Sequence, residues 1–270
     1  MKQRVLSAII MVAIVLVCML ISVYTRIAFF LAVAILCIRE LVHVYSLEDV
    51  HCTKLPLYFF PIAWSILLVL DVHMEIHPAY YLAAGFFAIV WIFAAAIANH
   101  TIYGRGAEAS LSILVYPLFL LLLIAAIGIT EHWYSVMILA CLATWTCDSF
   151  AMFGGKWFGK HKLAPYTSPN KTVEGTICGA ISSLLAGLAS YFLLRWLGHS
   201  VALWICLLAS LICSSVGQYG DLAASLFKRM VGIKDYSNLI PGHGGMMDRA
   251  DSLLFSIPSA WFILFLCHAL

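Results

Sequence analysis

The densest group of charged side chains in this sequence lies in residues 225–251, SLFKRMVGIKDYSNLIPGHGGMMDRAD. Only 10% of the 270 residues are charged, yet seven charged side chains fall in this segment. Asp221 lies just before the segment, and Asp248 and Asp251 lie at its end, all close to long apolar runs. Transfer of a phosphoryl or nucleotidyl group needs carboxylates that hold a divalent cation and basic groups that hold phosphates. The segment therefore predicts chemistry of that kind.

The rest of the chain indicates an integral membrane protein, because 64% of its residues are hydrophobic. Apolar runs long enough for helices lie at residues 5–24, 27–38, 55–70, 79–98, 111–129, 133–153, 176–194, 201–220 and 252–266. We predict an all-α, polytopic fold with about nine transmembrane helices, in a single membrane domain over residues 1–270. The run at 27–38 is the weakest, since twelve residues cover only about 18 Å of a hydrocarbon core about 30 Å thick. Residues 1–130 have no evident chemical role, and residues 131–270 form the predicted catalytic half.

Basic residues are unevenly distributed between the loops that these runs separate. If all nine runs cross the membrane, the N-terminus and every second loop share one side, which carries thirteen of the fifteen Lys and Arg. Only Arg26 and Arg195 fall on the opposite side. Loops rich in Lys and Arg stay in the cytoplasm. We therefore expect a protein of the cell membrane whose N-terminus and long loops 154–175 and 221–251 face the cytoplasm.

The nine cysteines predict no disulfide and no zinc site. Most of them lie singly inside apolar runs, and the sequence contains no Cys-x-x-Cys pair. We expect them to serve as small apolar packing residues.

The first long loop follows Asp148, a carboxylate near the end of an apolar run. A carboxylate there is costly in the membrane, so we expect either a role in metal binding or an ion pair with Lys156 or Lys160. The glycines and lysine of GGKWFGK, residues 154–160, have the spacing of a P-loop. His161 stands where Ser or Thr should be, and no strand precedes the motif, so we interpret it as a flexible turn.

SPNKT, residues 168–172, lies at the end of the same loop and directly before an apolar run. Ser168, Lys171 and Thr172 offer two hydroxyls and an ammonium group near a helix start, where exposed amides also favour anions. This pattern suits a phosphate. An ordinary helix start with Thr172 as the N-cap explains the spacing equally well.

In the second loop, helical spacing groups the charged residues. If the helix continues past Gly220, then Asp221, Ser225 and Lys228 share one face. Asp248 and Asp251, three residues apart, would likewise share a face at the start of the last helix. The glycines of PGHGG, residues 241–245, allow a close approach of the backbone to a ligand. His243 among them could bind phosphate or metal, or could be a turn residue with a local hydrogen bond.

Residues 225–251 closely resemble the signature of the phosphatidate cytidylyltransferases, or CDP-diacylglycerol synthases. The matching elements are Ser225, the pair Lys228 and Arg229, the pair Lys234 and Asp235, residues 241–245, and a closing Asp248, Arg249 and Asp251. GQYGDLAAS (217–225), DSFAMFGGKWFGKHKL (148–163) and SPNKTVEG (168–175) are similar to other blocks of that family. One departure is Asn170, where many members carry a second lysine.

The resemblance implies that the phosphate of phosphatidic acid attacks the α-phosphorus of CTP and releases pyrophosphate. It implies Mg²⁺ held by Asp221 and Asp248 with Asp251 and Asp148 near them, and a second ion such as K⁺. It also implies that phosphates of CTP or of the lipid bind to Lys171, Lys228, Arg229 and Lys234. Arg249 could hold a phosphate or pair with a neighbouring aspartate.

Two other functions remain open on the residues alone: a CTP-dependent lipid or polyprenol kinase, and a membrane transporter. The expected partners are CTP, phosphatidic acid and the lipid bilayer, with no nucleic acid. The resemblance also suggests a homodimer. The Gly-x-x-x-Gly spacing of GTICG, residues 175–179, could pack helices closely within one chain or between two.

Overall fold

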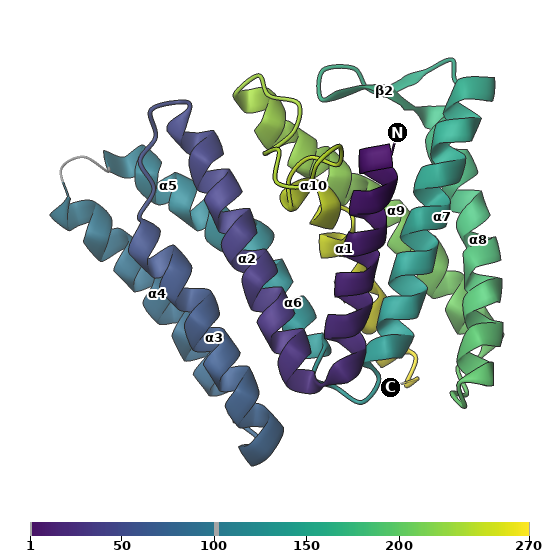
Figure 1. The fold of residues 1–270 in the computed structure, drawn as a ribbon, viewed down its shortest axis with the longest axis horizontal. Helices are drawn as coiled ribbons and strands as arrows, with labels where there is room; N and C mark the ends of the chain where they lie inside the picture. Colours follow the sequence, from purple (N-terminus) through teal and green to yellow (C-terminus); the bar gives the residue numbers. More distant parts are fainter. Residues whose placement is uncertain (1, 100–102, 270) are drawn as a thin grey trace. The chain divides into compact units, whose positions relative to one another are not determined.

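A computed structural model describes residues 2–99 and 103–269 (Figure 1). The chain folds as two compact units. The first contains the described residues up to Ile129 together with Met230–Arg249, and the second contains Thr130–Arg229 together with the described residues from Ala250 onward. Part of the predicted loop 221–251 therefore belongs to the same unit as the N-terminal helices.

The first unit is built from apolar helices. They are α1 (Lys2–Ile21), α2 (Val23–Ser46), α3 (Lys54–Met74), α4 (Ala79–Ala98), α5 (Tyr103–Ile113), a π-helical segment η1 (Leu114–Phe119) and α6 (Leu120–Ile127). Helix α2 lies at the centre of this unit, where it packs against α1, α3 and α6. Four side chains of its second half have no exposed surface: Cys37, Ile38, Leu41 and Val44.

A helix cap at Ser22 separates the first two helices. This position lies inside the apolar run at 5–24, which was expected to be one helix. The hydroxyl of Ser22 accepts a hydrogen bond from the Thr25 amide, and the Ser22 amide donates to the Thr25 hydroxyl. This reciprocal arrangement satisfies amides that would otherwise be unpaired at a helix start. The first helix therefore ends at Ile21, and the second is much longer than the expected 27–38 because it extends past Arg39 to Ser46. Its 24 residues span about 36 Å, enough to cross a bilayer core.

The second unit contains three long helices, α7 (Trp133–Phe158), α8 (Val173–Trp196) and α9 (Leu203–Met230), followed by α11 (Leu253–Leu266). The short α10 (Met247–Ala250) precedes α11 at the boundary between the two units. Between α7 and α8 lies an antiparallel hairpin of β1 (Lys162–Ala164) and β2 (Ser168–Thr172), with Lys162 opposite Thr172. The hairpin corrects the expectation of a loop without secondary structure over 154–175. Residues 154–158 are also helical rather than a flexible turn, because α7 continues to Phe158.

Helices α7 and α8 approach closely because glycines face the neighbouring helix. A side chain added at Gly179 would place its first carbon 2.8 Å from the carbonyl oxygen of Cys147, and one at Gly175 would place it 2.6 Å from that of Ala151. Small residues allow such close backbone contact between apolar helices. The spacing of GTICG is therefore used within the chain, between α8 and α7.

Eight helical stretches of the described chain are long and apolar enough to cross a membrane, and a shorter apolar helix covers Ile9–Ile21. This agrees with an all-α polytopic membrane protein, close to the nine spans expected. Helix α4 is buried least, and its apolar side chains such as Leu82 and Ile97 are 75% and 81% exposed. Such a surface is stable when it faces lipid. The nine cysteines are all free, and each is buried or half-buried.

We predict that Gly179→Ala destabilises the protein by about 1–3 kcal/mol, because the new methyl group would overlap the backbone of α7. The matched control is Gly85→Ala in α4, where an added methyl group would meet nothing within 4 Å. Alanine favours the helix there. Thermal unfolding in detergent should show a lower midpoint for the Gly179 variant alone, and equal midpoints for both variants would contradict the close packing of α7 and α8.

Candidate functional site

The hairpin and helix α9 are joined by an ion pair in the second unit. The ammonium group of Lys171 in β2 lies 2.6 Å from a carboxylate oxygen of Asp221 in α9. The same ammonium also donates to the carbonyl of Gln218 at 3.4 Å. A second contact joins these segments, since Nε of Arg229 donates to the carbonyl of Thr167 at 3.1 Å. Two charged blocks that are about fifty residues apart in sequence are thus brought together.

Helix α9 continues past Gly220 to Met230, as the predicted face of Asp221, Ser225 and Lys228 requires. Ser225 and Lys228 are only 7% and 8% exposed, whereas the Asp221 side chain is 32% exposed. A lysine so close to full burial is rare unless it is paired. This face therefore carries an accessible carboxylate and, about two turns further along the helix, a nearly buried lysine.

Glycines place this part of α9 against the start of the last span. A side chain at Gly220 would overlap the carbonyl oxygen of Asp251, and one at Gly217 would overlap the hydroxyl of Ser256. Asp221 is the next residue along the helix, so the backbone of Asp251 lies beside the segment that carries Asp221. The helix expected to carry Asp248 and Asp251 is interrupted, because α10 ends at Ala250 and Asp251 lies in a turn before α11, so their common face stays a prediction. There its carboxylate accepts from the Ser252 amide at 2.6 Å.

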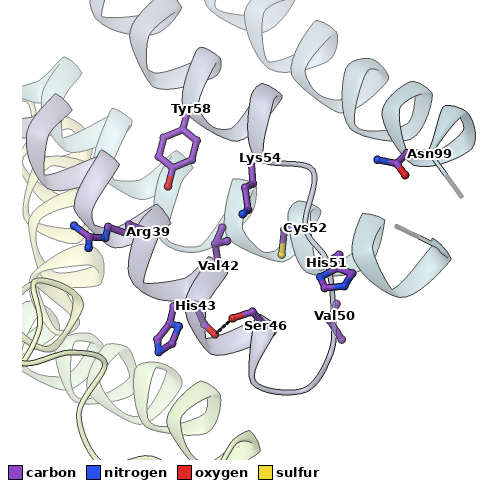
Figure 2. Close-up of a pocket in the computed structure, with 10 residues that line it drawn as sticks. All are labelled: Arg39, Val42, His43, Ser46, Val50, His51, Cys52, Lys54, Tyr58 and Asn99. Carbon is purple, nitrogen blue, oxygen red and sulfur yellow. Dashed lines mark hydrogen bonds between the residues drawn. The ribbon is translucent and has the colours of Figure 1, made fainter. Parts of the chain in front are cut away.

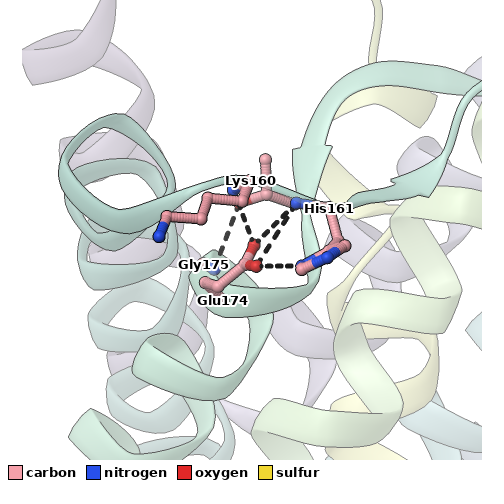
Figure 3. Close-up of polar contacts among 5 residues, drawn as sticks. Lys160, His161, Glu174 and Gly175 are labelled. Atoms are coloured by element: carbon pink, nitrogen blue, oxygen red, sulfur yellow. Dashed lines mark hydrogen bonds and ion pairs between the residues drawn. The ribbon is translucent and has the colours of Figure 1, made fainter.

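The hairpin is attached to α8 by a capped helix start, which Figure 3 shows in part. The hydroxyl of Thr172 accepts from the Gly175 amide at 3.1 Å, so the capping interpretation of SPNKT is confirmed. The carboxylate of Glu174 accepts from the backbone amides of Lys160 and His161 and lies 2.6 Å from Nδ1 of His161. These contacts hold both ends of the hairpin, and with them the strand that carries Lys171.

In the first unit, a buried carboxylate of α2 holds the PGHGG loop. Glu40 is 5% exposed, and its oxygens accept from the amides of Met246 and Met247 at 2.9 and 2.8 Å and from the Ser237 hydroxyl at 2.6 Å. Gly245 leaves room for this contact, since a side chain there would begin 2.6 Å from a Glu40 oxygen. Hydrogen bonds to a buried carboxylate are strong, so Glu40 fixes the backbone of this loop.

Asp248 is held in the same loop by its own backbone neighbours. It is 7% exposed, and its Oδ2 accepts from the amides of Tyr236 and Gly245, both at 2.9 Å. Gly244 adopts a positive φ of 83°, and a side chain there would begin 2.9 Å from this oxygen. These contacts set the orientation of the Asp248 carboxylate.

His243 is a turn residue whose amide donates to the carbonyl of Ile240 at 2.9 Å, the local hydrogen bond that one sequence interpretation expected. Its side chain makes a distant contact instead: Nδ1 lies 3.0 Å from the hydroxyl of Ser7 in α1, and this hydroxyl also donates to the carbonyl of Pro241 at 3.0 Å. Helix α1 therefore also contacts the loop.

The remaining predicted residues lie in other surroundings. Asp148, Lys234 and Arg249 are exposed, and Ser168 is half-buried in β2. The predicted carboxylates and cations are divided between the two units, with Asp248, Lys234, His243 and Arg249 in the first and Asp148, Asp221 and Asp251 in the second.

Sequence reasoning missed Glu40 and Ser7, the N-terminal residues that hold the loop. Glu40 carries a usable signal, since it is an acidic residue inside an apolar segment, where a charge needs a partner. Nothing in the sequence indicates that this partner lies about two hundred residues further along the chain. Ser7 carries no such signal.

Comparison with known proteins matches this architecture to one family. A sequence model described as the cytidylyltransferase family matches residues 2–267. The chain is 44% identical to a phosphatidate cytidylyltransferase of Staphylococcus saprophyticus over 122 aligned residues. This alignment covers 45% of this chain and 46% of the relative. A relative of the same name from Staphylococcus aureus is 47% identical over 119 residues, covering 44% and 45%. The aligned segments thus span less than half the length of these curated relatives.

We predict that Glu40→Gln loosens the loop it holds. The glutamine NH₂ group would face an amide donor in place of a carboxylate oxygen, and a buried donor left without an acceptor costs about 1–3 kcal/mol. Hydrogen exchange followed by mass spectrometry should show faster exchange in residues 237–247. Glu48→Gln, a change of the same kind at an exposed position in the turn after α2, serves as the control. Unchanged exchange in residues 237–247 would show that Glu40 does not stabilise them.

Proposed function

We propose, because this chain belongs to the cytidylyltransferase family, that it transfers the cytidylyl group of CTP to phosphatidic acid and releases pyrophosphate. The family match over residues 2–267 is the observation that carries this proposal. The relatives are named phosphatidate cytidylyltransferases, which supports phosphatidic acid as the acceptor. The product would be CDP-diacylglycerol, which remains in the membrane.

The membrane location suits substrates of opposite solubility. CTP dissolves in water, whereas phosphatidic acid keeps its acyl chains in the bilayer, so the reaction must take place at a membrane boundary. The excess of Lys and Arg in the loops on one side of the spans supports the cytoplasmic face. Because the relatives are bacterial, we propose the bacterial cell membrane as the location.

In the proposed reaction, a phosphate oxygen of phosphatidic acid forms a bond to the α-phosphorus of CTP, and the bond from that phosphorus to the bridging oxygen breaks. Pyrophosphate leaves with the bonding electrons. The nucleophile is ionised near neutral pH, so no strong general base is needed. Lys171, Lys228 and Arg229 would position phosphate oxygens and balance the charge that develops on them.

The residues present fit magnesium bound in part by the nucleotide. In the described part of the chain, no three His, Cys, Asp or Glu gather closely enough to hold a metal ion by themselves. Magnesium in nucleotide sites is usually held by one or two carboxylates, and phosphates and water complete its coordination. We propose Asp221 and Asp248 as these carboxylates, with Asp251 and Asp148 as further candidates. When bound, magnesium would neutralise phosphate charge.

The ion pair of Lys171 and Asp221 suits an exchange of partners. The two side chains are 24% and 32% exposed, so ligands can reach both. If a cation bound to Asp221 and a phosphate bound to Lys171, the ion pair between these two side chains would be replaced by two new ion pairs. Each side chain would keep a partner of opposite charge. A second ion such as K⁺ and a homodimer are further proposals that rest on the family resemblance. The Gly175 and Gly179 pair does not support the homodimer, since it packs α8 against α7.

We predict that the purified protein, with magnesium and phosphatidic acid, transfers label from the α-phosphate of CTP into the lipid extract and releases pyrophosphate. CTP labelled at the γ-phosphate should leave the lipid unlabelled. Transfer of γ label to an added polyprenol would instead identify a lipid kinase. No transfer to either acceptor would contradict a transferase and favour a transporter.

We predict that Asp248→Asn lowers turnover by roughly 100-fold or more, because loss of a metal-binding charge removes several kcal/mol of transition-state stabilisation. The asparagine oxygen can still accept from Tyr236 and Gly245, so the variant should fold. Asp248→Ala should also lose stability, since both buried amides lose their acceptor.

Turnover and thermal midpoint measured together separate these effects. Glu131→Gln, which removes a carboxylate at an exposed position in a loop of the second unit, should change neither quantity. Wild-type turnover of a folded Asp248→Asn variant would exclude Asp248 as a metal ligand.

A further inference from the structure

A basic pocket lies in the first unit, between the end of α2 and the start of α3. Its volume is about 440 Å³. Figure 2 shows the residues that line it, among them Arg39, His43, His51, Cys52, Lys54 and Tyr58. None of them belongs to the family signature or to the residues proposed for cytidylyl transfer.

The charge of this pocket is positive. Arg39 and Lys54 contribute two permanent cations, and His43 and His51 can contribute more. No carboxylate is among the lining residues. Glu40, next to Arg39 in sequence, is buried and bound to residues 237–247. The pocket thus offers cationic groups for an anion.

The other polar groups of the pocket suit a phosphate. In Figure 2, Arg39 lies at one end of the residues drawn and Asn99 at the other, with Lys54, Tyr58 and His51 between them. Burial raises the pKa of the Cys52 thiol to about 11, despite the lowering effects of its hydrogen bond to Ser110 and of nearby Lys54. This thiol is therefore neutral near pH 7 and adds no negative charge to the pocket. Several hydrogen-bond donors together with positive charge suit the oxygens of a phosphate group.

The pocket lies at the ends of two candidate membrane spans, where the headgroups of a bilayer are expected. It is lined by the last two turns of α2 and the first two turns of α3, and both helices are long and apolar enough to span a membrane. Apolar side chains continue along α3 from this end, with Leu55, Phe59 and Ile66 at 68%, 57% and 56% exposure. They could contact the acyl chains of a lipid whose phosphate occupies the pocket.

We propose that this pocket binds the phosphate of an anionic phospholipid headgroup. Lys54 and Arg39 provide the charge that selects an anionic headgroup, and Tyr58 provides a hydrogen bond. A free phosphate shares the same chemistry, but it would gain nothing from the apolar face of α3. The proposal does not depend on the reaction that the chain catalyses.

Native mass spectrometry of the whole protein in detergent, titrated with short-chain phosphatidylglycerol, tests this site. A basic residue near an anionic membrane surface contributes about fivefold to affinity, so Arg39→Gln with Lys54→Gln should weaken one binding event roughly 30-fold. Arg39→Lys with Lys54→Arg keeps both charges and should retain binding. Arg105→Gln with Arg195→Gln removes the same charge from exposed positions that do not line the pocket and should also leave binding unchanged.

Two outcomes would overturn the proposal. Equal lipid binding by the Arg39→Gln, Lys54→Gln variant and the wild type would show that the pocket is not the site. Binding of inorganic phosphate without binding of phosphatidylglycerol would assign the pocket to a free anion instead of a lipid.

Discussion

A charged group among apolar helices must find its partner within the protein, since lipid offers none. Glu40 meets this requirement with two backbone amides and a hydroxyl, and the partly exposed Asp221 is paired with the ammonium group of Lys171. These contacts also determine the positions of segments that have little apolar surface of their own. The PGHGG loop is fixed by Glu40, and the hairpin is fixed by its contacts with α8 and α9. The contacts that pair the charged groups are therefore also the contacts that position the candidate site residues.

Close packing of helices gives these contacts their precision. Gly175 and Gly179 bring α8 against α7, and Gly217 and Gly220 bring α9 against the start of the last span. A larger side chain at any of these positions would move a backbone that carries a charged group or a cap. Gly175, Gly179, Gly217 and Gly220 therefore have a packing role, whereas Gly242 and Gly244 adopt the left-handed backbone conformation, with φ of 80° and 83°.

The sequence could predict most features that depend on local pattern. Apolar length predicts the spans, helical spacing predicts the shared face of Asp221, Ser225 and Lys228, and Thr172 is recognisable as a cap. The break at Ser22 was missed because the capping residue at the third helical position is Thr25, not the Glu or Gln that marks a capping box in a sequence. The contact of Glu40 with residues 237–247 was not predictable, because it joins distant parts of the chain and depends on tertiary packing. The β-hairpin was missed because its strands are short and lie between charged residues that carry no alternating pattern.

The two compact units also explain why the N-terminal helices matter to a candidate site whose signature lies in the C-terminal half. Asp248 is oriented by a loop, and that loop is held by Glu40 of α2 and contacted by Ser7 of α1. A carboxylate whose orientation is already set by amide donors needs little rearrangement to meet a cation. The N-terminal helices therefore serve as the support for this loop, and the chemistry proposed for Asp248 depends on residues about two hundred positions earlier in the chain.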